Sequence, residues 1–263
     1  SIKSSKNRFL ACKKNLFLVQ MKLNKKKHLS LNQDFFIIWS ISKKTKTKMK
    51  KITFIGLLLI VMSCGKHPTS NNLNEKDTAD VSAYVDPNIG TAHSRWFFYT
   101  PAAVPFGMAK LGPSTNGSYG NEQGWEAVGY DERHQSIEGF ANLHEFQIGG
   151  FLFTAMTGEL KTTPGSLEQP DEGYRSRFDK NDEIARPGSY QVRLKDYDID
   201  VALTATERVG FQKYTFPKSD SAYLIFDIGN KLGESGEVKD AKVWFDKATN
   251  TIEGWVITYP EYV

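Results

Sequence analysis

The sequence has few cysteines, and its long C-terminal part has none. Only Cys12 and Cys64 are present among the 263 residues. No disulfide can therefore support a fold in residues 65–263, and hydrophobic burial alone has to stabilise it. A stretch of this length is sufficient for that.

Acidic residues are almost absent from the N-terminal part. Residues 1–63 contain 1 of the 30 Asp and Glu residues but 15 of the 34 Lys and Arg residues, so residues 64–263 hold 29 acidic and 19 basic side chains and a net charge of −10. The formal net charge of +4 therefore averages two unlike segments. An acidic folded part excludes nucleic acid as the expected partner.

The apolar run Ile52–Met62 is too short to span a bilayer but has the length of a signal-peptide hydrophobic region. The short basic region Met49–Lys51 precedes it, and Val61–Met62–Ser63–Cys64 closes it in the pattern of a bacterial lipobox. We predict a lipoprotein signal peptide at residues 49–63 and lipidation of Cys64, which would tether the protein to a membrane. An ordinary secretory signal that contains a cysteine is the alternative.

The segments on either side of this signal have low-complexity character. Residues 1–48 start with Ser1 and mix lysine runs with short apolar patches, without sustained periodicity. We interpret them as an upstream non-native or disordered segment; a basic nucleic-acid-binding arm is the alternative. Residues 64–80 are rich in Ser, Asn, Thr and Lys and are expected to form a flexible tether. Residues 81–263 then form the folded domain.

Alternating apolar residues predict strands in the second half of the domain. The expected strands lie at residues 190–194 and 199–205, which alternate regularly, and at residues 209–216, where a phase slip near Lys213 suggests a bulge. The continuous apolar run at residues 222–228 is typical of a buried strand, and residues 243–257 are expected to form a hairpin. Closely spaced strands whose alternation gives each sheet one solvent-exposed face predict an all-β fold, an antiparallel β-sandwich. Residues 86–165, rich in Gly, Pro, Trp and Tyr, are typical of long functional loops.

A series of motifs in and after these loops resembles a known family. The motifs are Val85–Thr91, Pro101–Met108, Gly124–Trp125, Gly129–Asp131, Ser136–Phe140 leading to His144, Ser176–Phe178, Ala185–Tyr190 and Leu203–Phe211. In this order they resemble the N-terminal domain of glycoside hydrolase family 92, the calcium-dependent exo-acting α-mannosidases. The similarity runs from about Tyr84 to Phe216 and weakly beyond.

The resemblance implies a two-domain enzyme in which this β-sandwich packs on a larger helical domain, with the active site between them. It further implies that the catalytic acid, the base and most ligands of a Ca²⁺ cofactor lie in the helical domain, outside this chain. No catalytic residue is nominated here, because sequence alone gives no carboxylate pair a defined separation. The chain stops just after an expected strand, so we expect the sandwich to be truncated.

Four residues are candidate contacts to a sugar, whose ring offers apolar faces and polar edges. Trp96 and Trp125 lie in loops and could stack on a ring; packing within the loop or the core is the alternative for each. His144 and Glu145 could hydrogen-bond sugar hydroxyls. Both surrounding loops depart from the family pattern, at residues 94–99 and 145–150, which leaves the mannose linkage open.

Other polar residues favour structural roles. Glu122, Glu126, Asp131 and Glu132 are dense enough to suggest calcium ligands, but their spacing is not that of an EF-hand, and a solvated acidic face is the favoured explanation. Arg177, Glu207 and Arg208 are interpreted as ion-pair partners or loop anchors, with sugar contact as the alternative.

Two functions from different classes follow. The first is the carbohydrate-facing N-terminal domain of an exported α-mannosidase that cleaves terminal mannose by a calcium-assisted inverting mechanism. The second is a membrane-tethered, non-catalytic glycan-binding sandwich; a purely structural anchor is a third possibility. The first expects an exposed apolar patch where the second domain packs. Gly65 and Lys66, rather than Asp, follow Cys64 and favour the outer membrane, on its periplasmic or cell-surface side.

Overall fold

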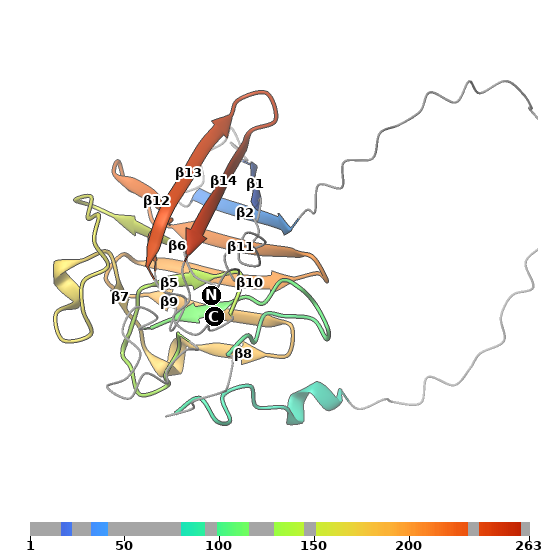
Figure 1. The fold of residues 1–263 in the computed structure, drawn as a ribbon. Helices are drawn as coiled ribbons and strands as arrows, with labels where there is room; N and C mark the ends of the chain where they lie inside the picture. Colours follow the sequence, from blue (N-terminus) through green and yellow to red (C-terminus); the bar gives the residue numbers. More distant parts are fainter. Residues whose placement is uncertain are drawn as a thin grey trace, which may run out of the picture.

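The computed structural model describes residues 80–92, 99–115, 129–144, 151–230 and 237–258, together with the backbone of residues 17–22 and 33–41. Its regular structure is almost entirely antiparallel β-sheet, which confirms the predicted fold class (Figure 1). The helices of this part are short 3-10 turns: η1 (Val81–Tyr84), η2 (Pro170–Glu172) and η3 (Lys180–Asp182). In the ranges given above, no helix has the length and apolar character needed to cross a membrane.

The strands form one large and two smaller sheets. The large sheet has the order β13-β14-β1-β2-β11-β10-β9-β8. Its strands are β1 (Phe17–Lys22), β2 (Gln33–Ile41), β8 (Ile184–Arg186), β9 (Ser189–Leu194), β10 (Ile199–Ala205), β11 (Val209–Phe216), β13 (Val238–Asp246) and β14 (Thr251–Thr258). A four-stranded sheet has the order β12-β6-β5-β3, and β4 pairs with β7. These strands are β3 (Gly112–Ser114), β4 (Ser136–Ile137), β5 (Gly139–Ala141), β6 (Leu152–Thr157), β7 (Ser176–Arg177) and β12 (Ala222–Asp227).

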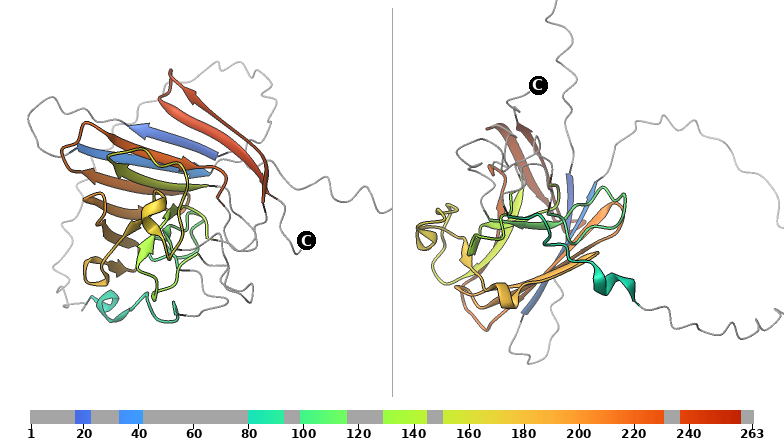
Figure 2. Two further views of the ribbon diagram at one scale, coloured as in Figure 1. Left: turned by 90° about the vertical axis from the view of Figure 1, so that its left-hand side faces the viewer. Right: turned by 90° about the horizontal axis from the view of Figure 1, so that it is seen from below.

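The four-stranded sheet packs against one face of the large sheet (Figure 2). Phe140 of β5 is fully buried between them, with its ring centroid 6.5 Å from that of Tyr190 on β9 and 6.1 Å from that of Tyr214 on β11. The inward residues of β9 and β10 complete this core, as their alternation predicts: Tyr190, Val192, Leu194, Ile199, Val201 and Leu203 are all buried.

Strand β11 is regular, and the predicted bulge near Lys213 is wrong. Its pairing with β10 runs without a shift from Ala205↔Gly210 to Asp200↔Thr215. The apolar pattern misled because a polar residue, Gln212, occupies an inward position. Its side chain donates to Asn142 Oδ1 at 3.0 Å and accepts from the Tyr214 hydroxyl at 2.6 Å. These hydrogen bonds offset the cost of burying an amide.

The C-terminal strands are more exposed than the sequence suggests. Strand β12 lies at the edge of the four-stranded sheet and is only partly buried, so the expectation of a fully buried strand is wrong. The predicted hairpin is confirmed as β13 and β14, and a register shift between Val238 and Asp240 accompanies their pairing. Val243 and Phe245 of β13 are exposed, because β13 is the outer strand of the large sheet.

Two stretches of residues 1–48 contradict the expectation that this segment lacks regular structure. Strand β2 pairs with β11 along its whole length, and β1 joins β2 to β14. Backbone hydrogen bonding to the free edge of β11 requires no long-range periodicity in the added strand, which is why sequence patterning did not find it. Residues 42–79, including the predicted signal peptide, Cys64 and nearly all of the tether, lie outside the described residues.

The close packing of β5 on β6 leaves no room for a side chain at Gly139. A Cβ atom there would lie 2.6 Å from Leu152 Cγ and 2.8 Å from the Phe153 carbonyl oxygen. Since the backbone of β6 cannot move without disturbing the sheet, we expect Gly139→Ala to lower the free energy of unfolding by about 1–3 kcal/mol in urea denaturation. Gly229→Ala is the control, because its Cβ would meet only Asp227 Oδ1, at 3.5 Å. Equal stability of the two variants would contradict this packing.

Candidate functional site

Described residues that flank residues 93–98, 116–128 and 145–150 in the chain lie close together beside β3 and β5; these three stretches themselves lie outside the described residues. The Tyr99 carbonyl oxygen and the His144 ring both lie against Gly112: a Cβ on Gly112 would be 2.3 Å from that oxygen and 3.2 Å from His144 Cε1. Tyr99 follows the first segment and His144 precedes the third. A glycine is therefore required at residue 112 for the two loop ends to meet at β3.

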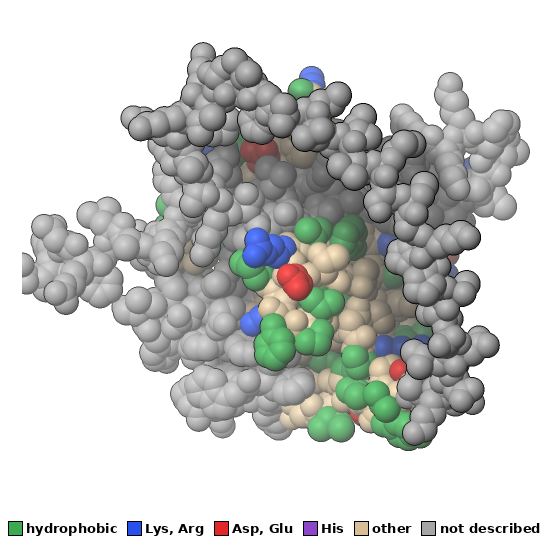
Figure 3. Space-filling model, turned by 90° about the vertical axis from the view of Figure 1, so that its right-hand side faces the viewer, with side chains coloured by type: hydrophobic (Ala, Val, Ile, Leu, Met, Phe, Trp, Pro, Cys, Tyr) green, Lys and Arg blue, Asp and Glu red, His purple; other side chains and the backbone are tan. Residues whose placement is uncertain are grey.

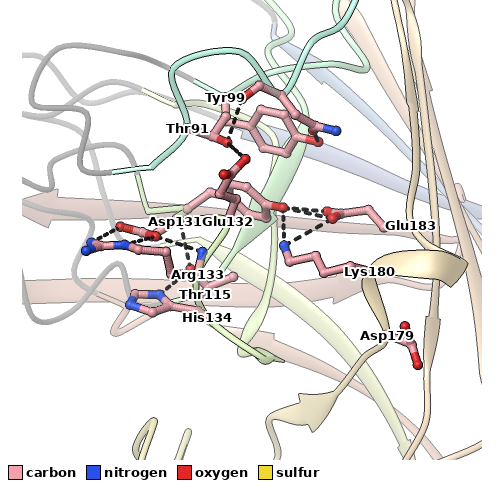
Figure 4. A network of polar contacts seen from close by, with 12 residues as sticks. Thr91, Tyr99, Thr115, Asp131, Glu132, Arg133, His134, Asp179, Lys180 and Glu183 are labelled. Carbon is pink, nitrogen blue, oxygen red and sulfur yellow. Dashed lines mark hydrogen bonds and ion pairs between the residues drawn. The ribbon is translucent and has the colours of Figure 1, made fainter.

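Thr115 forms the base of the middle segment. Its amide donates to the Gly129 carbonyl at 2.5 Å, which joins the two residues that flank residues 116–128. Its hydroxyl accepts from the Asp131 amide at 3.0 Å and lies 2.8 Å from His134 Nδ1 (Figure 4). One threonine thus fixes the beginning and the end of this loop through both its backbone and its side chain.

Asp131 is buried directly after the middle loop and is paired with an arginine. The Arg133 guanidinium donates to both oxygens of the Asp131 carboxylate, at 2.8 and 2.5 Å, and the Arg133 amide donates to it at 2.9 Å. The carboxylate is only 3% exposed, whereas the arginine side chain is 46% exposed. The bidentate pair gives this carboxylate a structural role. The sequence favoured a solvated acidic face for Asp131, which is wrong because the residue is buried.

The first and middle loops are joined to each other. The Thr91 hydroxyl donates to Glu132 at 3.0 Å and the Glu132 amide donates to the Thr91 carbonyl at 3.3 Å. On the other side of the first loop, the Tyr99 ring stacks on Tyr130 with a centroid distance of 4.1 Å. The described residues that flank residues 93–98 and 116–128 are therefore joined by hydrogen bonds and ring stacking, and we call this set the shared base (Figure 4).

Below this base, Glu183 forms a polar cluster with two tyrosines and a lysine. The hydroxyls of Tyr130 and Tyr190 both donate to its carboxylate, at 2.8 and 2.7 Å, and the Lys180 ammonium lies 3.1 Å from it. Burial, reinforced by the nearby Glu183 carboxylate, raises the pKa of both tyrosine hydroxyls well above the usual range. They therefore stay protonated at neutral pH and act as hydrogen-bond donors rather than as acids or nucleophiles.

His144 is completely buried, and its Nδ1 lies 3.0 Å from the Lys110 carbonyl oxygen. Burial lowers the pKa of its imidazole, so the ring is neutral at physiological pH and donates from Nδ1. The Nε2 atom has no hydrogen-bond partner among the described residues. This hydrogen bond fixes the orientation of the ring, and Nε2 is buried in the protein interior.

Of the four predicted site residues, His144 is the one that belongs to the described part of the chain. Trp96, Trp125 and Glu145 lie outside the described residues, and their predicted role stays a prediction. In the described ranges, no three His, Cys, Asp or Glu side chains are arranged to hold a metal ion. Arg177 confirms its predicted structural role, since it forms ion pairs with Asp171 and Asp196.

Sequence reasoning missed the residues that hold the loops. Thr115, Tyr130 and Glu183 give no signal by spacing, because their partners are up to 60 residues away in the chain. Tyr130 belongs to the Gly129–Asp131 motif noted above, which was the one pointer to this base. Catalysis is not assigned to any of these residues, because each carboxylate of the base is engaged in hydrogen bonds or an ion pair.

Comparison with known proteins agrees with this arrangement. The glycosyl hydrolase family 92 N-terminal domain matches residues 84–262. Two solved structures of a family GH92 α-mannosidase from Bacteroides thetaiotaomicron, one in complex with mannoimidazole, share the fold with a TM-score of 0.55 and 24% sequence identity. The alignments cover 68% of this chain and 30% or 31% of the solved chains, so this chain spans about a third of their length. No curated protein matches the sequence.

The family match covers more than half of the chain and begins at Tyr84, where the resemblance in the motifs also begins. It includes the strands of the sandwich core and the whole base of the three loops. The chain therefore belongs to glycosyl hydrolase family 92 and contains the N-terminal domain of that family.

Proposed function

We propose that this chain is the carbohydrate-facing N-terminal domain of an exported exo-α-mannosidase, which removes terminal mannose from glycans with inversion of the anomeric centre. The observation that carries the proposal is the match to the family 92 N-terminal domain over residues 84–262. A solved family GH92 α-mannosidase with the same fold is bound to mannoimidazole, which supports mannose as the substrate class.

The role proposed for this domain is to present three loops to the terminal sugar. A rigid base with aromatic residues in the attached loops is suited to a sugar ring, which needs apolar platforms and a few placed polar groups. Trp96 and Trp125 would supply platforms and Glu145 would supply hydrogen bonds, whereas the buried His144 would support the segment that carries Glu145. The acid and base of hydrolysis are assigned to a second, helical domain of a longer polypeptide.

Exposed hydrophobic residues support a second domain as the partner. Hydrophobic side chains reach the surface on one face of the molecule (Figure 3). In the described part, exposed large hydrophobic residues include several at residues 81–89 and 106–108, where Tyr84 is 86% exposed and Phe106 fully exposed; Leu160, Ile184, Val243 and Phe245 are exposed as well. Phe106 also has a positive φ of 59°, which is unfavourable for a side chain of its size. A surface of this kind is suited to burial against another domain.

Calcium is proposed for the complete enzyme but not for a site within the described residues. Their acidic side chains do not form a ligand set, and Asp131, the buried acid nearest the loops, is paired with Arg133. The ligands would lie in the second domain. Calcium would there supply a positive charge that polarises the bound sugar.

The proposal is tested by extending the reading frame beyond codon 263 and assaying the encoded protein on α-mannosides. We expect release of mannose from chain ends, and a reduction in kcat/KM of about tenfold or more in Trp125→Ala, because the sugar loses an aromatic platform. Trp244→Phe on β13 is the matched control and should retain activity. Calorimetric mannose binding without any hydrolysis would favour the glycan-binding sandwich instead.

Removal of calcium gives an independent check on the complete enzyme. We expect a chelator to abolish hydrolysis and added Ca²⁺ to restore it, since the cation is proposed to bind the reacting sugar. Thermal unfolding measured in parallel separates loss of catalysis from loss of the fold. Hydrolysis that is insensitive to chelator would overturn the calcium mechanism while leaving the substrate class intact.

Export as an outer-membrane lipoprotein is proposed from Cys64 and the residues before it. Cys64→Ser should remove the acyl modification, and the protein should leave the membrane fraction, because stable anchoring needs the acyl chains. Mass spectrometry of the mature N-terminus and membrane fractionation measure both effects. Cys12→Ser should change neither, and an unchanged membrane fraction in Cys64→Ser would contradict lipidation.

A further inference from the structure

Residues 101–111 form a loop whose two ends lie in the core and whose tip is exposed. Ala102 and Leu111 are both fully buried, and the Ala102 amide donates to the Leu111 carbonyl at 3.3 Å in an isolated bridge. The carbonyl of Pro101, which is also buried, accepts from the Gly188 amide at 2.8 Å. These backbone contacts fix the base of the loop on the sandwich.

The tip of the loop is a tight turn with an unusual residue in it. The Gly107 amide donates to the Val104 carbonyl at 2.9 Å. Pro105 takes the second position of this turn, and Phe106, with a φ of 59°, takes the third. Proline in the second position and a positive φ in the third are features of a type II turn, whose third residue is usually glycine or asparagine. A phenylalanine in this position is strained.

Phe106 differs from the other non-glycine residues that have a positive φ in the described part of the chain. These are Asp198, at 57°, and Asn250, at 54°, and each lies in a turn between paired strands. Short polar side chains tolerate this conformation at small cost, whereas a phenyl ring does not. Because the Phe106 side chain is fully exposed, packing within this domain does not explain its presence.

The turn between β10 and β11 holds the tip in place. The Met108 amide donates to the Glu207 carbonyl at 2.6 Å, so two of the motifs noted in the sequence, Pro101–Met108 and Leu203–Phe211, meet here. Met108 is itself exposed, and so are residues 206–208 beside it. An apolar tip next to a polar turn is the arrangement of core and rim at protein interfaces.

A rigidly held, exposed aromatic side chain is suited to anchor an interface, because little further ordering is needed when it is buried against a partner. We propose that Phe106, with Met108 beside it, anchors this domain in an apolar pocket of the second domain of the complete protein. The length of the solved family GH92 chains supports this partner, since most of each chain lies outside the part that matches. The identity of the partner rests on the proposed function; the strained presentation of Phe106 does not.

Hydroxyl-radical footprinting tests the contact directly. The 263-residue chain is compared with the polypeptide that is encoded when the reading frame is extended beyond codon 263, and modification of Phe106 is measured by mass spectrometry. We expect the rate of modification to be lower by about tenfold or more in the extended polypeptide, because an anchor in a desolvated pocket is not reached by the radical. An equal rate in the two proteins would overturn the proposal.

The variant Phe106→Asn should have opposite effects on the two proteins. Asparagine tolerates the positive φ, so the unfolding temperature of the 263-residue chain should stay the same or rise by about 1–3 °C. In the extended polypeptide it should fall by about 4 °C or more, because the interface loses its anchor. Asn250→Gly is the matched control, since it changes another residue with a positive φ and should affect both proteins alike. An equal decrease in both proteins for Phe106→Asn would contradict an interface role.

A second copy of the chain is the other partner that an exposed ring could take, and light scattering of the 263-residue chain distinguishes it. We expect a monomer in which Phe106 is modified rapidly. A dimer that protects Phe106, and that dissociates in Phe106→Asn, would overturn the second domain as the partner.

Activity of the extended polypeptide separates this inference from the proposed function. If it hydrolyses α-mannosides while Phe106 is modified as rapidly as in the 263-residue chain, the inference fails and the proposed function stands. If Phe106 is protected but no α-mannoside is hydrolysed, the proposed function fails and the anchor stands.

Discussion

The packing of Phe140 between the two sheets is the constraint on which the rest of the structure depends. Its ring contacts Tyr190 and Tyr214 on neighbouring parts of the large sheet, so the four-stranded sheet has one orientation against it. Strands β3 and β5 of that small sheet lead into residues 116–128 and, through His144, into residues 145–150. The core contact therefore fixes the positions of Thr115 and His144, the described residues that precede these two stretches.

Around this core, hydrogen bonds from buried polar side chains hold the segments whose strands are too short to hold them by backbone pairing alone. Strands β3, β4, β5 and β7 have only two or three residues each, which gives few ladder hydrogen bonds. Buried charged groups compensate through directed hydrogen bonds, as Glu183 does for two tyrosines and Arg175 does for Thr115. Because these groups lie in the protein interior, each hydrogen bond is stronger than it would be in water, and each missing partner is more costly.

Strands could be predicted from the sequence where apolar and polar residues alternate regularly. They could not be predicted correctly where a polar side chain occupies an inward position. Strands β9 and β10 could be predicted residue by residue, because every inward position is apolar. In β11 the inward Gln212 broke the pattern, and its acceptor on Asn142 lies 70 residues away, beyond any local signal. The resemblance in the motifs identified the family. The shared base depends on contacts between residues far apart in the sequence, which the spacing of the motifs could not predict.

The position of β1 and β2 determines how the proposed processing at Cys64 would change the large sheet. They lie between β11 and β14 and precede Cys64, so processing at Cys64 would remove both strands from the middle of the large sheet. Strand β11 would then have a free edge, and the β13–β14 hairpin would lose its pairing to that sheet. A free edge of eight residues is a template for strand addition, which exported proteins have to cover. If Cys64 is processed as proposed, this edge of β11 would have to be covered by polypeptide other than residues 17–41.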